Sequence, residues 1–252
     1  MSLQELKRLA ESLPERRGWD FSFVRDDVDP VPWSYREVAR RYLSPLQRVL
    51  DIGTGGGEQF LALAGHYGSG VGIDADPEMV AIAEGNTPPA VACRVKFLAM
   101  DAAALEFPAN SFDVVLNRHA PAYPAEIARV LRPGGVFITQ QIGARNHGNI
   151  TALFGCGPDG QHKREAGQTV AAWAEAFTAQ GCAIRARAEY DVPYFYQDAA
   201  SLLFWLRALP MPEDFALERH WPQVAHILTA FQTARGIATN VHRELLIVQK
   251  PG

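Results

Sequence analysis

A glycine-rich turn at residues 51–58 limits the possible folds of this chain more than any other segment. It reads Asp-Ile-Gly-Thr-Gly-Gly-Gly-Glu and lies between a short apolar run and a helical pattern. Glycines at such a turn let the backbone bend tightly and let a ligand approach main-chain amides at a helix N-terminus. A phosphate loop needs a Lys after its glycines, and no Lys or Arg occurs between Asp51 and Gly70. The dinucleotide fingerprint would place its third glycine at Glu58, which weakens that interpretation without excluding it, and a nucleoside site stays open.

Strand-like and helix-like segments alternate along the middle of the chain. Apolar runs at 49–52, 71–74, 95–100, 112–116 and 136–140 alternate with helical patterns near 57–66, 77–85 and 123–131. This alternation predicts an α/β fold, a parallel sheet covered by helices on both faces. In such a sheet a ligand binds outside the carboxyl ends of the strands, where the strand order reverses. Asp74 ends the second of these strands, 21 residues after Gly53, and supplies an acid suited to ribose hydroxyls.

Two flanking regions break this rhythm. Near the N-terminus, leucines at helical spacing predict an amphipathic helix that stops at Pro14, and a second helical pattern follows at 34–43. In the C-terminal third, a helix near 168–180 and a strand at 183–190 come before a helical, aromatic-rich stretch at 193–238 and a final strand at 244–248. We therefore predict one domain, 1–252, with a helical lid at 1–46, a core at 47–191 and 240–250, and a helical cap at 192–239 inserted before the last strand.

Charge and cysteine content restrict the class of protein. The 24 Lys and Arg residues against 28 Asp and Glu give a net charge of −4, which disfavours a nucleic-acid partner. The three cysteines form no Cys-x-x-Cys pair and the histidines show no ligand spacing, so we predict neither a disulfide framework nor a metal site. No apolar stretch reaches the roughly 18 residues that span a bilayer, and the N-terminus is not signal-like. We expect a cytoplasmic protein without a membrane partner, and the sequence leaves its oligomeric state open.

Five motifs follow one another in the order of a known family. Residues 49–57, 71–76, 100–102, 111–115 and 130–135 read Val-Leu-Asp-Ile-Gly-Thr-Gly-Gly-Gly, Val-Gly-Ile-Asp-Ala-Asp, Met-Asp-Ala, Ser-Phe-Asp-Val-Val and Val-Leu-Arg-Pro-Gly-Gly. Together they resemble the motifs of class I S-adenosylmethionine-dependent methyltransferases. The resemblance implies a Rossmann-like sheet with helices on both faces and S-adenosyl-L-methionine as the cofactor.

The resemblance also implies which residues bind the cofactor. Asp51 and the glycines would face its methionine end and Asp74 its ribose, while Asp101 and the amide of Ala102 would face the adenine. The implied cofactor-binding residues are Asp51, Gly53, Thr54, Gly55, Gly57, Asp74, Ala75, Asp101, Ala102 and Asn117. The cofactor carries a sulfonium and an ammonium, and the loop offers Asp51 and Glu58 without basic residues. Glu58 is equally well explained as a first-turn acid favoured by the helix dipole.

Polar side chains follow the fourth and fifth predicted core strands. The fourth ends in Asn117, Arg118 and His119, and the fifth in Thr-Gln-Gln at 139–141. Methyl transfer depends mainly on alignment, so a general base is optional. His119 is the candidate base because histidine titrates near neutrality, and a histidine bonded to backbone at a helix start is the equal alternative. Arg118 would hold an acidic substrate group or form an ordinary salt bridge.

A closer resemblance is to a bacterial methyltransferase subgroup with an unassigned acceptor. It rests on 117–119, 139–143, Trp19-Asp20-Phe21, Pro32-Trp33, 204–206 and 212–215. Enzymes that methylate amino groups of bases or glutamine carry Asn/Asp-Pro-Pro-Tyr/Phe after the fourth strand, and cytosine C5 enzymes carry a Pro-Cys nucleophile. This chain has neither, and Asn117 stands where the magnesium-dependent catechol type would have an acid.

Aromatic residues of the flanking regions complete the predicted acceptor site. Its residues are Trp33, Tyr35, Arg118, Gln140, Gln141, Tyr196 and Trp205. An aromatic cap shields a reaction from water and binds flat or apolar molecules, but the same side chains are sufficient to pack a small helical insert. We predict transfer of a methyl group to an O or N nucleophile of a small molecule. The alternatives are a non-catalytic cofactor-binding partner or sensor, an RNA methyltransferase and, last, a nicotinamide oxidoreductase.

Overall fold

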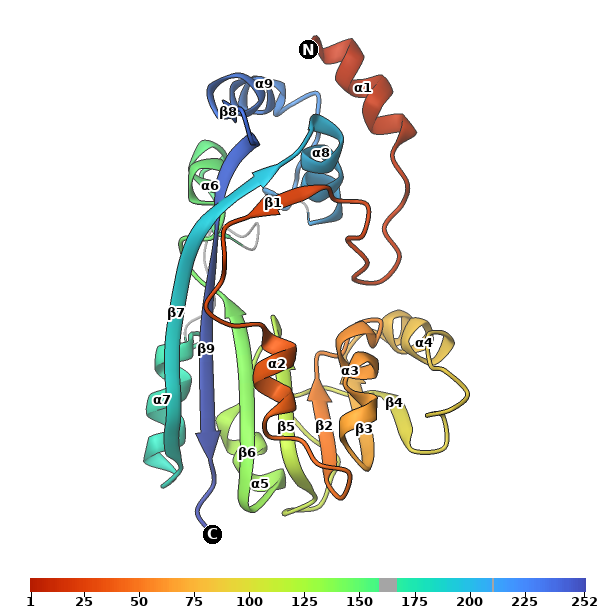
Figure 1. Ribbon diagram of the computed structural model, residues 1–252, viewed down its shortest axis with the longest axis vertical. Helices are drawn as coiled ribbons and strands as arrows, with labels where there is room; N and C mark the ends of the chain where they lie inside the picture. Colours follow the sequence, from red (N-terminus) through yellow and green to blue (C-terminus); the bar gives the residue numbers. More distant parts are fainter. Residues whose placement is uncertain (159–166, 210) are drawn as a thin grey trace. The chain divides into compact units, whose positions relative to one another are not determined.

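The computed structural model describes residues 1–158, 167–209 and 211–252, and the chain forms two compact units (Figure 1). The flanking unit consists of Met1–Pro32, Ile142–Glu165 and Glu189–Arg243. The core unit consists of Trp33–Gln141, Ala166–Ala188 and Glu244–Gly252. Two long strands, β7 (Ala183–Tyr196) and β9 (Gly236–Gln249), contribute residues to both units.

The core unit is built on a sheet whose first strands run parallel. These strands are β2 (Arg48–Ile52), β3 (Ser69–Asp74), β4 (Val95–Ala99), β5 (Phe112–Arg118) and β6 (Leu131–Ile142). Their order is β6-β5-β2-β3-β4, and β9 followed by β7 continues the sheet beyond β6. The chain moves outward from β2 to β4 and then returns to β5 on the other side of β2. This reversal places the ligand-binding crevice of such a fold at the carboxyl ends of β2 and β5.

Helices cover both faces of the core sheet. They are α2 (Tyr35–Arg40), α3 (Glu58–Ala62), the 3-10 helix η1 (Ala64–His66), α4 (Pro77–Gly85), α5 (Pro124–Val130) and α7 (Val170–Ala179). Successive side chains of β2 enter different apolar clusters, because neighbouring residues of a strand point to opposite faces. Leu50 belongs to the cluster that contains Phe177 of α7, whereas Val49 belongs to the cluster that contains Tyr35 and Phe60. The predicted α/β class, with helices on both faces, is confirmed.

The flanking unit has its own apolar core. Its elements besides parts of β7 and β9 are α1 (Leu3–Ser12), β1 (Asp26–Val28), α6 (Gly148–Phe154), α8 (Ala199–Ala208), α9 (Trp221–Ala230) and β8 (Gln232–Thr233). Helix α1 begins with a capping box in which Ser2 and Glu5 bond each other's backbone amides. Leu6 of α1 is fully buried in the same cluster as Leu202 and Ile227. Strand β1 pairs antiparallel with β7 and lines up Asp27 with Phe195.

The structure differs from the sequence-based expectation mainly in the length of the last strands. Residues 193–196 and 236–238, expected to be helical, belong to β7 and β9. Along β7 exposed and half-buried residues alternate almost to its end, which is the pattern of a strand with one covered face. The compact units also place Ile142–Glu165 with the flanking unit, where the sequence suggested core. The boundaries of lid, core and cap therefore stay a prediction.

No helix among the described residues has the length and apolar character needed to cross a membrane. The longest described helices, such as α1 and α7, have 10 residues, and a helical span requires roughly 20.

Candidate functional site

The glycine turn after β2 adopts a backbone conformation that is unfavourable for residues with a side chain. Gly53, Gly55 and Gly57 have φ angles of +69°, +55° and +78°, in the left-handed region. A Cβ on Gly53 would lie 2.2 Å from the Cβ of Ala120, in the turn after β5. The amide of Thr54 donates to the carbonyl of Ile73 at 2.9 Å. The turn is thus held between the ends of β3 and β5.

Asp74 ends β3 and faces this turn. Its Oδ2 accepts a hydrogen bond from the amide of Gly55 at 2.8 Å, and its Oδ1 accepts one from the amide of Asp76 at 3.1 Å. The side chain is half-buried and Ala75 beside it is exposed. Each carboxylate oxygen accepts more than one hydrogen bond, so the Asp74 carboxylate retains acceptor capacity for hydroxyl groups of a ligand.

Asp51 is a buried carboxylate at the base of the turn. Burial raises its pKa to about 7, the nearby Asp74 adds to that rise, and Thr54 and Arg118 act in the opposite direction. Only 6% of the residue is exposed. A buried carboxylate with a raised pKa gains most from a cation, because an opposite charge favours its ionised form. The position suits an ammonium or sulfonium group.

The end of β4 lies beside the end of β3. The amide of Met100 donates to the carbonyl of Asp74 at 2.9 Å. Asp101 is exposed and its Oδ1 accepts from the amide of Ala103 at 2.8 Å, while Ala102 is half-buried. The predicted adenine-binding residues Asp101 and Ala102 therefore follow the strand next to the one that ends in Asp74.

Asn117 is fully buried at the carboxyl end of β5. Its Oδ1 accepts hydrogen bonds from Oγ1 of Thr139 at 2.8 Å and from Nε2 of Gln141 at 2.6 Å. Its Nδ2 donates to the carbonyls of Ile52 at 3.4 Å and of Pro121 at 3.2 Å. These bonds occupy the four hydrogen-bonding positions of the amide. The Asn117 side chain thereby joins three strands, and the cofactor contact that the sequence resemblance implies for Asn117 stays a prediction.

His119 and Gln140 lie close to Asn117 in the chain and in the paired strand. His119 is half-buried with φ +60°, and its amide donates to the carbonyl of Gln140 at 3.0 Å. The side chain of Gln140 accepts a hydrogen bond from Nε1 of Trp33 at 3.2 Å. Arg118, the last residue of β5, is also half-buried. The predicted base and three predicted acceptor-binding residues therefore belong to one edge of the core unit.

Tyr35 and Gln140 are the two most enclosed of the predicted acceptor-binding residues in the core unit. Tyr35 is 6% exposed in the apolar cluster that also contains Val38 and Phe60. Burial and the neighbouring Asp51 raise the pKa of Tyr35 well above its ordinary value. Tyr35 packs against the core, and its phenol stays neutral beside the buried carboxylate.

Tyr196 and Trp205 lie in the flanking unit, in its buried aromatic cluster. Tyr196 is fully buried and Trp205 is 7% exposed. Tyr196 stacks on His147 with ring centroids 5.8 Å apart, and the tilted ring of Trp205 contacts the same imidazole at 4.3 Å. The structure therefore shows packing for both side chains, and acceptor binding stays a prediction for them.

His147 was not singled out by the sequence. It is the N-cap residue of α6 with φ +51°, and burial lowers its pKa to about 3. The only sequence signal is that a His precedes Gly148 before a helical pattern. No spacing rule identifies such a residue.

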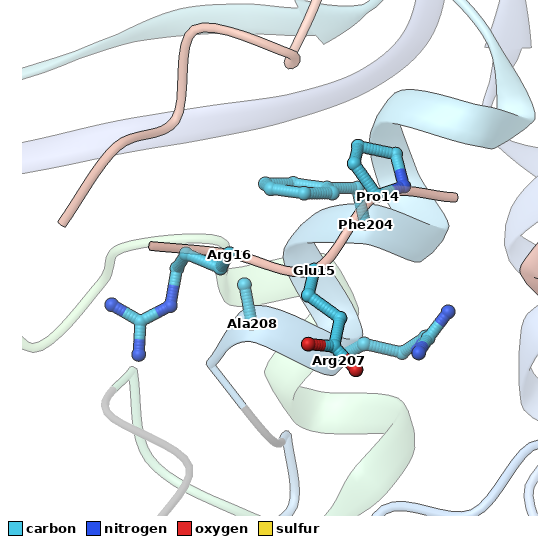
Figure 2. A pocket seen from close by; sticks show the side chains of 6 residues that line it. All are labelled: Pro14, Glu15, Arg16, Phe204, Arg207 and Ala208. Atoms are coloured by element: carbon cyan, nitrogen blue, oxygen red, sulfur yellow. The ribbon is translucent and has the colours of Figure 1, made fainter. Parts of the chain in front are cut away.

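A shallow hollow of about 250 Å³ lies in the flanking unit (Figure 2). Its lining residues are Pro14, Glu15, Arg16, Phe204, Arg207 and Ala208. The guanidinium groups of Arg16 and Arg207 both donate to main-chain carbonyls, of Gly18 and Ala10. Among the described residues no group of three His, Cys, Asp or Glu side chains is arranged to hold a metal ion.

Comparison with known proteins gives one family match and several relatives. Residues 50–139 match the family model described as "Methyltransferase domain". The chain is 38% identical over 140 residues to a 2-methyl-6-phytyl-1,4-hydroquinone methyltransferase of Synechocystis sp., which covers 52% of this chain and 43% of that protein. It is 36% identical over 98 residues to the uncharacterized methyltransferase YcgJ of Bacillus subtilis, covering 36% and 39%.

The structure of YcgJ superimposes with a TM-score of 0.65 at 23% identity, over 86% of this chain and 98% of that one. This likeness shows a shared fold. The chain spans about two fifths of the length of the first curated relatives it matches.

Proposed function

We propose that this chain, which belongs to the class I methyltransferases through its domain at residues 50–139, binds S-adenosylmethionine and transfers its methyl group to a small molecule. One observation carries the proposal. The Asp74 carboxylate that ends β3 accepts a hydrogen bond from the amide of Gly55, and this bond brings the acid and the glycine turn after β2 together at one edge of the sheet. Asp51, buried at the base of the same turn, adds a carboxylate suited to a cation.

The residues of this edge fit the chemical groups of the cofactor. Asp74 would accept hydrogen bonds from the ribose hydroxyls, and Asp51 would pair with the ammonium of the methionine end. Asp101 and Ala102, which follow β4, would bind the adenine. When bound, the cofactor supplies a methyl carbon activated by its sulfonium. Gly53, Gly55 and Gly57 carry no side chain of their own, which would let a ligand approach the main chain of the turn.

The acceptor is proposed to be a small molecule with an O or N nucleophile. The Synechocystis relative is named for a hydroquinone, and other relatives are named for demethylmenaquinone and for fatty acids. In this chain His119, at the carboxyl end of β5, would take up the proton that the nucleophile loses when it is methylated. Arg118 and Gln140 would orient the acceptor, and Trp33 would hold the Gln140 side chain.

The experiment that tests this function follows the transfer of a labelled methyl group. Purified protein is incubated with S-adenosylmethionine labelled at its methyl and with a panel of quinols, phenols, fatty acids and amines. We expect label in one class of acceptor, and loss of transfer in Asp74→Ala. Asp113→Ala is the matched control, because Asp113 is a carboxylate near the start of β5, bonded to Arg132. Cofactor binding without label in any acceptor would favour the non-catalytic alternative.

A further inference from the structure

Three residues form a row across adjacent strands at the edge that carries the site. Asn117 of β5 is paired with Ile52 of β2 on one side and with Thr139 of β6 on the other. All three are nearly inaccessible to solvent, with exposed fractions of 1% or less. A buried polar side chain in such a row must find its partners on the neighbouring strands.

The side-chain amide of Asn117 has hydrogen-bond partners on both neighbouring strands, β2 and β6. Its Nδ2 reaches the carbonyls of Ile52 and Pro121, and its Oδ1 receives the Thr139 hydroxyl and the Gln141 amide. Only one orientation of the amide satisfies this set, because the two carbonyls require donors on the same side. The end of β5 is thereby tied to β2 and β6.

Gln141 extends the network to the turn after β5. Its Nε2 lies 3.2 Å from the carbonyl of Ala120 and 2.7 Å from Oγ1 of Thr139, as well as 2.6 Å from Oδ1 of Asn117. The carbonyls of two successive turn residues, Ala120 and Pro121, are therefore held by the side chains of Gln141 and Asn117.

The same turn lies directly against the glycine loop. The Cβ of Ala120 occupies the space beside Gly53, so closely that a Cβ on Gly53 would lie 2.2 Å away. A shift of Ala120 therefore changes the room available to Gly53. Thr54 and Gly55 follow Gly53 directly in the chain. Such a shift would therefore also move the Gly55 amide, which donates a hydrogen bond to Asp74.

We propose that Asn117, together with Thr139 and Gln141, is a positioning residue that holds Ala120 against Gly53 and so fixes the shape of the cofactor-binding turn. The inference deepens the proposed function and rests on it for the identity of the ligand. It assigns Asn117 no contact with the cofactor. Its effect reaches the ligand only through the 117–121 turn.

The test removes one hydrogen-bonding group of the network, the Thr139 hydroxyl, by a substitution that nearly keeps the volume of the side chain. Thr139→Val removes the hydroxyl that donates to Asn117, and Thr139→Ser keeps it. Val114→Ala is the control for a general loss of stability, because Val114 is 1% exposed in the same strand as Asn117 and takes no part in the network. Gln141→Leu removes the bond to Ala120 from a half-buried position, which gives a second variant if Thr139→Val does not fold.

Two quantities are measured for each variant. Calorimetry gives the affinity for S-adenosylhomocysteine, and NMR gives the amide resonances of Gly53 and Gly55 without ligand. We expect Thr139→Val and Gln141→Leu to weaken binding by about tenfold or more and to shift both resonances. Thr139→Ser and Val114→Ala should stay within about twofold of the wild type.

Equal loss of affinity in Val114→Ala, or Thr139→Val within about twofold of the wild type, would overturn the inference. If the wild-type protein binds no S-adenosylhomocysteine, the proposed function fails instead. The resonances then decide the inference, and unchanged Gly53 and Gly55 signals in both Thr139→Val and Gln141→Leu would refute it.

Discussion

The main-chain amide of Gly55 donates a 2.8 Å hydrogen bond to Oδ2 of Asp74, and this bond joins the turn after β2 to the end of β3. The two residues are 19 positions apart in the chain. This hydrogen bond explains why the glycine turn and Asp74, which are distant in sequence, lie at one place in the fold.

Replacing Gly53 should disturb the turn through two separate effects. Gly53→Ala places a Cβ 2.2 Å from that of Ala120 and demands φ +69° of an alanine. The left-handed backbone costs about 1–2 kcal/mol, and the overlap adds about 1–3 kcal/mol. We expect a lower free energy of unfolding, measured in urea. The double variant Gly53→Ala/Ala120→Gly should recover the part due to overlap, and no recovery would mean that Ala120 is not the obstacle.

Cofactor affinity should depend on pH through Asp51. Its pKa of about 7 without ligand means that below pH 7 the carboxyl is protonated and must release its proton to pair with a cation. Affinity should therefore rise by up to about tenfold per pH unit as the pH approaches 7 and level off above it. Calorimetry at pH 5.5–8.5 measures this, and Asp51→Asn should flatten the profile. A wild-type profile as flat as that of Asp51→Asn would contradict the assignment.

Stability should fall in acid because of His147. Its pKa is about 3 in the folded protein and near 6.5 when unfolded, so the unfolded state binds more protons between these values. The contribution of the neutral, buried imidazole is complete above pH 6.5 and declines by about 1.4 kcal/mol per pH unit below it. Urea unfolding at pH 7.5 and 5.5 measures the loss. His147→Asn, which tolerates a positive φ, should reduce this pH dependence, and His226→Gln, at an exposed position of α9, should not.

The proposed base can be tested by a substitution that its backbone accepts. His119 has φ +60°, which asparagine adopts more readily than alanine. His119→Asn should lower turnover about 10²–10⁴-fold and leave the affinity for S-adenosylhomocysteine unchanged. His66→Asn, an exposed position in η1, is the control. Loss of cofactor affinity in His119→Asn would reassign the residue to a structural role.

The sequence predicted the sheet and the glycine turn because both depend on local patterns. Apolar runs of four to six residues and helical repeats identified β2 to β6, and the strand-like runs at 183–190 and 244–248 identified parts of β7 and β9. The Asn117 network could not be predicted in the same way. The network forms only because the register of β5 pairs Asn117 with Ile52 of β2 and Thr139 of β6. That register is determined by residues far apart in the chain.

Residues 193–196 and 236–238 show the opposite limit. They read Pro-Tyr-Phe-Tyr and Gly-Ile-Ala, and both adjoin segments with helical patterns. Their strand conformation follows from pairing within the sheet, which such short segments do not reveal. His147 is a similar case, since its low pKa comes from burial among Tyr194, Tyr196 and Trp205. Burial of this kind has no signature in a single sequence.

The most direct measurement is a calorimetric titration of the purified chain with S-adenosylhomocysteine, comparing the wild type with Asp74→Ala and Asp113→Ala. We expect binding by the wild type and by Asp113→Ala, and a loss of about tenfold or more in Asp74→Ala, because a carboxylate's hydrogen bonds contribute about 1.5–3 kcal/mol. No binding by the wild type, or equal binding by wild type and Asp74→Ala, would contradict this expectation.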